Sequence, residues 1–170
     1  MEERKLQLEK LRAEIWKSAS YIHDEEGLIK DLMKKTGPVL GAENISFMPF
    51  NQGKQKVIVK FVWRKDGKTT GVGDSVPAWI FKKYLGKEYI YLSFDKLPKN
   101  LISVLSPFHD KYHTKTTLII PFGNADDPEG FLCSNTYTYH KKYSKDEISV
   151  FQDVSRIICL RMKQIRTEKR

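Results

Sequence analysis

The sequence predicts a single α+β domain with a long helix at each end and antiparallel strands between them. Near both ends, apolar residues recur at the three- and four-residue spacing of helices, whereas the segments between show the two-residue alternation of strands. Short turn-forming sequences separate neighbouring strands, which favours antiparallel hairpins. At 170 residues the chain has the usual length of one domain and can bury a core without metals or disulfides.

The first helix is expected from Arg4 to about Tyr21, a stretch without glycine or proline. Positions three and four residues apart form a heptad seam, made of Leu8, Leu11, Ile15, Ser18 and Ile22. This seam fits a coiled coil with another helix, and it fits equally an amphipathic helix that lies on its own domain. The sequence leaves both alternatives open.

A second helix is expected to begin at Asp24, whose side chain can cap it. Its buried face consists of Leu28, Ile29, Leu32 and Met33. Because proline interrupts the helical hydrogen-bond ladder, we expect residues 36–38 (Thr-Gly-Pro) to end or kink this helix.

Two strands are predicted next. Ile45, Phe47 and Pro49 alternate with Ser46, which predicts a half-buried first strand, and residues 51–53 (Asn-Gln-Gly) give a hairpin signal. Residues 54–64 are expected to form one continuous second strand. Its apolar face contains Val57, Val59, Phe61 and Trp63.

Residues 71–114 are predicted to be irregular, because glycines and prolines interrupt them. A short helix is expected after Pro77, and a short strand at residues 89–92. Residues 116–122 then form a buried central strand, residues 123–130 a turn, and residues 131–139 its antiparallel partner.

The last helix is predicted to begin at Ser144, which forms a capping box with Glu147. It carries two adjacent apolar stripes, of which the first is Ile148, Phe151, Ser155, Ile158, Met162 and Ile165, and the second Val150, Val154 and Ile157. Two stripes need two partners. We expect one to pack on the sheet and the other on a helix of the same chain or of a second subunit.

Three segments follow from this pattern: residues 1–23 as an N-terminal signalling helix, 24–160 as the domain, and 161–170 as a C-terminal helix extension or linker. Ile158, Met162 and Ile165 are expected to extend past the domain and to be exposed there. On that ground the sequence predicts a homodimer through the terminal helices.

Basic residues outnumber acidic ones, with 30 Lys and Arg against 21 Asp and Glu and a formal net charge of +9. Such a charge suits an acidic partner such as nucleic acid. The basic residues, however, are spread along the chain and mostly alternate with apolar ones, as on the solvent side of strands and helices. We therefore expect a solvated surface, and nucleic-acid binding is the less favoured alternative.

No export signal or membrane segment is predicted. The first residues are charged with no apolar run behind them, and no run reaches the roughly 20 apolar residues of a membrane-spanning helix. Cys133 and Cys159 form neither a C-x-x-C pair nor a zinc cluster, so we expect buried, reduced thiols. The expected location is the cytoplasm, with no membrane contact by this segment.

Four short stretches occur in an order that is typical of one family: residues 40–46 (LGAENIS), residues 86–90 (GKEYI), residues 117–122 (TLIIPF) with 130–132 (GFL), and residues 143–148 (YSKDEI). In this order they resemble the GAF domain family, over residues 28–160. The resemblance implies an antiparallel sheet of five or six strands with the N- and C-terminal helices on one face. On the other face it implies a small-molecule pocket under short helices and loops.

The resemblance also points to ligand-binding candidates, most of them aromatic: Trp79, Tyr84, Tyr91, Phe108, His109, Tyr112, His113, Phe122 and Cys133. An aromatic cavity with few polar groups suits a planar organic ligand. The alternative is that these aromatic side chains form ordinary core.

The known ligand classes of the family are not matched in this sequence. The ordered signature of cyclic-nucleotide-binding members is absent. The cysteine-histidine pair that attaches bilins is missing, because Phe108 precedes His109 and both cysteines lie elsewhere. The cysteines of the methionine sulfoxide reductase branch are absent as well, so the cofactor or ligand stays unknown.

No motif for catalysis is present, since the sequence has no nucleophile elbow, phosphate loop or metal-binding spacing. His109 and His113 are four residues apart, but surface histidines are the favoured interpretation and no metal site is predicted. The sequence therefore predicts a regulatory sensory domain, not an enzyme, which works with the output domain of a larger signalling protein such as a histidine kinase, chemoreceptor or cyclase. A ligand-free structural dimerisation domain is the alternative.

Overall fold

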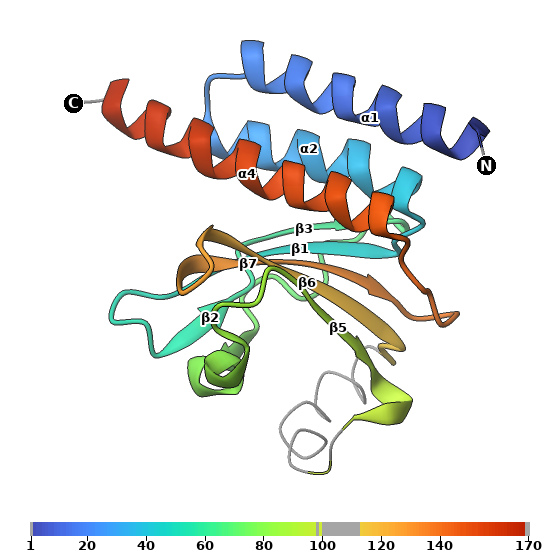
Figure 1. Cartoon of the computed structure of the whole chain (residues 1–170). Helices are drawn as coiled ribbons and strands as arrows, with labels where there is room; N and C mark the ends of the chain where they lie inside the picture. Colours follow the sequence, from blue (N-terminus) through green and yellow to red (C-terminus); the bar gives the residue numbers. More distant parts are fainter. Residues whose placement is uncertain (1, 98, 100–112, 169–170) are drawn as a thin grey trace.

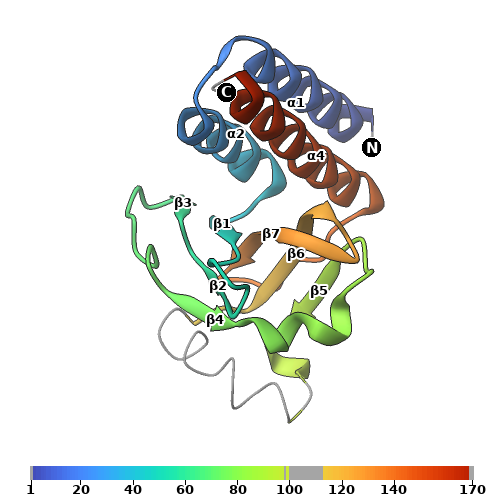
Figure 2. The same cartoon turned by 90° about the vertical axis from the view of Figure 1, so that its left-hand side faces the viewer.

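The computed structural model describes residues 2–97, 99 and 113–168. A five-stranded antiparallel sheet carries three helices on one face and a small two-stranded sheet on the other (Figures 1 and 2). The helices are α1 (Glu2–Tyr21), α2 (Glu25–Leu40) and α4 (Lys145–Glu168). This arrangement confirms the predicted α+β class, the antiparallel sheet and the placement of the terminal helices on one face.

The helix α1 lies on its own domain. Its seam residues Leu8, Leu11 and Ile15 are buried in the core that α1 shares with α2 and α4 (Figure 1). Burial of this apolar stripe removes it from water and so stabilises the helical layer. Of the two alternatives for the seam, the structure therefore has the amphipathic helix.

The helix α2 begins as predicted and ends later than predicted. The Asp24 carboxylate accepts a hydrogen bond from the Gly27 backbone N–H at 2.8 Å. The helix then passes through Pro38 and ends at Leu40, where Gly41 has a φ of 71°. Proline removes only one helical hydrogen bond, and the cap at Gly41 and Ala42 satisfies the carbonyls of Pro38 and Gly37, so the helix does not end at residues 36–38.

The large sheet has the order β3-β1-β7-β6-β5, and every pairing in it is antiparallel. The strands, with their bounds, are β1 (Asn44–Pro49), β3 (Phe61–Arg64), β5 (Ile90–Ser93), β6 (Thr116–Asn124) and β7 (Asp127–Thr136). In the β6–β7 hairpin only Ala125 and Asp126 lie between the strands, so the turn is shorter than the predicted residues 123–130.

The predicted continuous strand at residues 54–64 is divided between the two sheets. Strand β2 (Lys56–Ile58) pairs with β4 (Ser75–Pro77) in the small sheet, whereas β3 pairs with β1. The change takes place at Val59, which donates to the Asp74 carbonyl, and Lys60, which donates to the Phe47 carbonyl. The prediction was wrong because the two-residue alternation is the same on both sides of this switch.

The helix α4 starts with the predicted capping box: the Glu147 N–H donates to the Ser144 hydroxyl at 3.1 Å, and the Ser144 N–H donates to the Glu147 carboxylate at 3.0 Å. Its side chains Ile158, Met162 and Ile165 are buried within the helical layer. The expectation that they are exposed was therefore wrong, because α1 and α2 cover α4. None of the helices in the described part of the chain has the length and apolar character that crossing a bilayer requires.

Candidate functional site

A cavity of about 110 Å³ lies between the large sheet and the small sheet, on the face away from the helices. Figure 2 shows β2 and β4 on this side. One wall comes from β1, β7 and β6, and the other from β4 and from the 3-10 helix η1 (Ala78–Tyr84). The cavity lies on the sheet face where the sequence predicted a pocket under short helices and loops.

Paired residues of neighbouring strands share a face of the sheet, so the residues of the sheet wall form rows across the strands. These rows change from polar at one end of the cavity to apolar at the other. In the first row the register aligns three polar residues across β1, β7 and β6, namely Asn44, Asn135 and Thr117. The second row consists of Ser46, Cys133 and Ile119. Met48, from the third row, continues the wall toward its apolar end.

Asn44 holds the polar row together. Its Oδ1 accepts hydrogen bonds from Ser46 Oγ at 2.9 Å and from Asn135 Nδ2 at 2.7 Å, and its Nδ2 donates to the Trp63 carbonyl at 2.9 Å. Asn44 is almost fully buried, so these bonds also satisfy polar groups that water does not reach. The network fixes the orientation of the Asn135 amide at the cavity wall.

The Cys133 thiol is the sulfur group of this wall. Its Sγ donates a weak hydrogen bond to Met48 Sδ at 3.5 Å. Burial raises the pKa of Cys133 to about 12, because the thiolate would lose its hydration. The side chain is therefore a neutral thiol at neutral pH and a poor nucleophile. Cys159 on α4 is only half-buried, which corrects the expectation that both thiols are buried.

The opposite wall is apolar. Val76 of β4 and the η1 residues Ile80, Phe81 and Tyr84 line it. The Phe81 ring stacks on Phe131 with their centroids 4.3 Å apart, which anchors η1 to the sheet. The helix η1 begins directly after Pro77, as the sequence predicts for a proline at a helix start.

Of the predicted ligand-binding residues, Tyr84 and Cys133 line this cavity. Trp79 also lies on η1, but its side chain is 60% exposed and it is not among the lining residues. His113 is exposed and likewise outside the lining. Phe108, His109 and Tyr112 lie outside the described residues.

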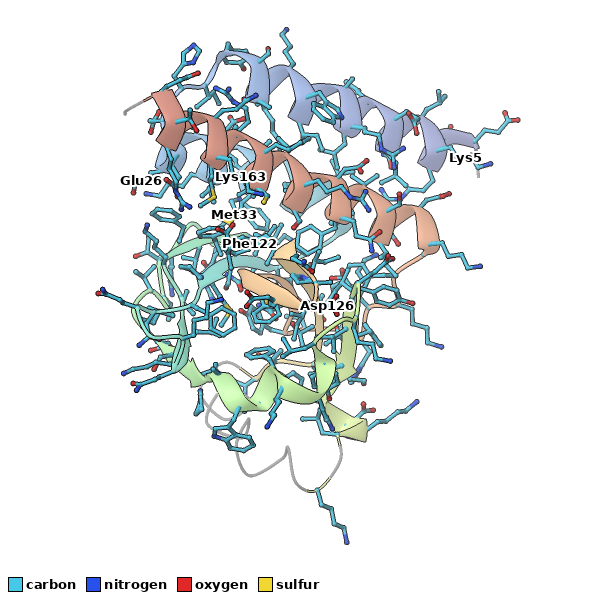
Figure 3. The ribbon with its side chains drawn as sticks, turned by 60° about the vertical axis from the view of Figure 1, so that its left-hand side comes forward. Lys5, Glu26, Met33, Phe122, Asp126 and Lys163 are labelled. Atoms are coloured by element: carbon cyan, nitrogen blue, oxygen red, sulfur yellow. The ribbon has the colours of Figure 1, made fainter. Side chains whose placement is uncertain are left out.

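Tyr91 and Phe122 lie on the helix-facing side of the sheet, which corrects the expectation that they face the pocket. Phe122 is packed in the core below the helices, where its ring stacks on Phe47 with centroids 4.8 Å apart (Figure 3). The Tyr91 hydroxyl donates to the Lys141 carbonyl. The reason is strand alternation, because Leu92 and Ile119, one and three residues away, are the ones that face the cavity.

The polar row of Asn44, Asn135 and Thr117 was not among the predicted site residues. A signal was present, since Ser46 is the polar position of the first predicted strand and Asn44, directly before that strand, has the same phase. The polar phase of a half-buried strand ordinarily faces water. In the structure the small sheet and η1 cover it, so the polar phase becomes the wall of a cavity.

Comparisons with known proteins show likeness in structure and none in sequence. No protein-family model matches the chain, and no curated protein matches it. A phycoerythrobilin-bound GAF domain from a cyanobacterial phytochrome has a TM-score of 0.79 and 13% identity, covering 98% of this chain and 100% of that one. The chain has the GAF fold.

Two further solved structures agree with this fold. The GAF domain of Thermosynechococcus elongatus PixJ, in its blue-light absorbing form, has a TM-score of 0.71 and 14% identity, covering 86% of this chain and 89% of that one. The chromophore-binding domain of a Stigmatella aurantiaca phytochrome has a TM-score of 0.73 and 11% identity, covering 91% of this chain and 59% of that one. The GAF fold thus extends over most of the present chain, α1 and α4 included.

Proposed function

We propose that this chain is a sensory domain of a signal-transduction protein, which binds a small molecule in the cavity and passes its occupancy to the terminal helices. The observation that carries the proposal is the cavity itself, apolar on most sides and bounded by an ordered polar row. Pockets of this composition suit small organic molecules. The bilin-bound GAF domains of similar fold support the same role.

A chain of contacts connects the cavity wall with the helical layer. Leu92 of β5 lines the cavity, and its neighbour Tyr91 donates to the carbonyl of Lys141, in the segment before α4. Lys141 Nζ lies 3.0 Å from Glu147 Oε2, and Arg4 Nη2 of α1 lies 2.6 Å from the same oxygen. A shift of β5 can therefore reach the first turns of both α4 and α1.

Glu147 is the junction of this path, and it is charged although it is buried. Burial alone would raise the pKa of Glu147, but hydrogen bonds from the Ser144 N–H, Lys141 and Arg4 outweigh burial and hold the pKa below its ordinary value. Breaking one of these contacts leaves a buried carboxylate short of partners. That penalty gives the junction an energetic means of favouring one helix arrangement over another.

The ligand acts on the helices only to the extent that it binds two arrangements of the chain with different affinity. Within this proposal, residues 1–23 are the signalling helix, residues 24–160 the sensory domain and residues 161–170 the extension toward an output domain. A histidine kinase, chemoreceptor or cyclase in the cytoplasm would supply that output. The role is regulatory, and no group of three or more His, Cys, Asp or Glu in the described residues is placed to hold a metal.

The dimer prediction loses its original argument, because Ile158, Met162 and Ile165 pack inside the same chain. A homodimer through the terminal helices would have to use side chains that remain exposed on this layer, which include Leu6, Trp16 and Leu160. We keep the dimer as a separate proposal that the sensory role does not require.

Native mass spectrometry of the freshly purified chain tests the sensory proposal. We expect a co-purifying small molecule on the wild type and its loss in Ile119→Phe, which fills the cavity from the sheet wall. Leu160→Phe, an equal increase in size at an exposed site, is the matched control. Circular dichroism shows whether each variant is folded. A wild type that carries no molecule and binds none in a broad small-molecule screen would support the structural alternative instead.

A further inference from the structure

The cavity also indicates which chemical class of ligand it takes, an inference that rests on the proposed function. We propose that the ligand is a compact, uncharged molecule with a hydrogen-bonding group at one end of an apolar body. The charge of the described lining residues, the polar row and the size of the cavity each lead to this class.

The charge of the lining disfavours an anion. Among the described residues that line the cavity, none is Lys, Arg or His, and the acidic residue Asp74 is present. Moving a carboxylate or phosphate out of water requires an opposite charge or several donors in return. The described walls therefore disfavour a ligand that carries an anionic group at its buried end.

The polar row of the cavity wall supplies hydrogen-bonding partners for the polar end of the ligand. Asn44 already uses its Oδ1 and Nδ2 on Ser46, Asn135 and the Trp63 carbonyl, so it holds its neighbours in place. Asn135 donates one amide hydrogen to Asn44, which leaves its carbonyl oxygen and its other amide hydrogen for a ligand. Thr117 forms no side-chain hydrogen bond with the described residues, and its hydroxyl can donate as well as accept.

The remaining walls fit an apolar body. Ile119 and Met48 on the sheet face Val76, Ile80 and Phe81 on the other side. A volume of about 110 Å³ limits the buried part of the ligand to about one ring with a short substituent. The Cys133 thiol at this wall is protonated at neutral pH, so we expect binding without a covalent bond.

Three probes of similar shape separate charge from hydrogen bonding: benzamide is uncharged with a polar end, benzoate has the same shape and a negative charge, and toluene has no polar end. Binding to the full chain is measured by titration in protein NMR. We expect benzamide to bind at least about tenfold more tightly than benzoate, because burying the charge is penalised. Biliverdin, which carries carboxylates on a much larger body, is expected to show no tight binding.

Thr117→Val removes the hydroxyl and keeps the β-branched shape. We expect it to weaken benzamide binding roughly two- to tenfold, the worth of one hydrogen bond, and to leave toluene binding unchanged or tighter. Thr69→Val, at an exposed threonine outside the lining, is the control and should change neither affinity. Loss of toluene binding in Thr117→Val would show that the variant distorts the cavity, and Asn135→Leu then tests the same polar row from the neighbouring strand.

The outcomes separate the two proposals. Benzoate or biliverdin binding as tightly as benzamide would overturn the ligand class and leave the sensory function standing. Equal binding of benzamide and toluene in the wild type would overturn the role of the polar row. Binding of none of the probes, together with no co-purifying molecule, would overturn both the class and the sensory function.

Discussion

The hydroxyl of Tyr91 donates a hydrogen bond of 2.5 Å to the backbone carbonyl of Lys141, and this bond ties the edge strand β5 to the segment that precedes α4. The two residues are far apart in the sequence, because Tyr91 precedes the β6–β7 hairpin and Lys141 follows it. Because Leu92, next to Tyr91, lines the cavity, the bond offers one route by which, under the proposed function, a change at the cavity reaches the segment before α4.

Tyr91→Phe removes this bond and keeps the ring. We expect it to lower the free energy of unfolding by about 1 kcal/mol and to change benzamide affinity less than about threefold, because Tyr91 does not line the cavity. Hydrogen exchange in the first turns of α1 and α4 should respond to saturating benzamide in the wild type and not in the variant. Tyr89→Phe, at a neighbouring exposed tyrosine, is the control. An unchanged helix response in Tyr91→Phe would show that coupling takes another route.

Glu147→Gln tests the junction between Lys141 and Arg4 through its pH dependence. The pKa of Glu147 is below its ordinary value of 4.5 in the folded state, so the unfolded chain binds this proton more tightly. The stabilisation is therefore complete above that ordinary value and is lost as the pH falls through the folded pKa. We expect Glu147→Gln to lower the unfolding free energy by about 1 to 3 kcal/mol at pH 7, with a flatter decline in acid.

Urea unfolding of the wild type and Glu147→Gln between pH 7 and pH 3 measures this difference. Glu88→Gln, at an exposed glutamate, is the matched control and should follow the wild-type profile. If Glu147→Gln and the wild type lose stability in parallel on acidification, the ion pairs of Glu147 do not contribute and the junction has no energetic role.

Ile158→Glu tests whether Ile158 is a core residue of α4 or a residue of a dimer interface. Ile158 is fully buried under α1 and α2, so an unpaired carboxylate there should lower the unfolding free energy by at least about 3 kcal/mol or prevent folding. Leu160→Glu, two residues further on and 54% exposed, should change it by less than about 0.5 kcal/mol. Sedimentation of Leu160→Glu then tests self-association in a folded chain. A folded, monomeric Ile158→Glu beside a dimeric wild type would restore the original dimer argument.

Local signals in the sequence were sufficient for the starts of α2 and α4. The cap at Asp24 and the capping box of Ser144 and Glu147 depend on residues three positions apart, and both form as predicted. The strand at residues 116–122 was equally clear, because its apolar run from Leu118 to Phe122 indicates burial on both faces.

The sidedness of the strands could not be read in the same way. Phe122 and Cys133 are both buried and apolar, and only the pairing of β6 with β7 and the layer above each face decide that Phe122 packs below the helices and Cys133 lines the cavity. The polar row was not predicted for the same reason. Asn44 looks like a solvent-facing residue until the small sheet, formed from distant residues, covers it.

Trp79 and Phe122 were both predicted to bind ligand. Truncating each to Ala should have different effects on stability and on ligand binding, and both effects should differ from those at a residue that lines the cavity. Phe122→Ala opens a hole in the core below the helices and should lower the unfolding free energy by about 3 to 5 kcal/mol. Trp79→Ala removes a side chain that is largely in water, so we expect a change below about 1 kcal/mol and unaltered benzamide binding.

Ile80→Ala, from the same 3-10 helix as Trp79, provides the comparison within the cavity wall. Ile80 is buried and lines the cavity, so its truncation should weaken both the fold and the binding of toluene, by removing apolar contacts that both depend on. Denaturant unfolding and NMR titration of the three variants give the two quantities separately. If Trp79→Ala abolished benzamide binding while Ile80→Ala left it intact, the ligand would bind on the outer side of η1, and the cavity between the two sheets would be ordinary core packing.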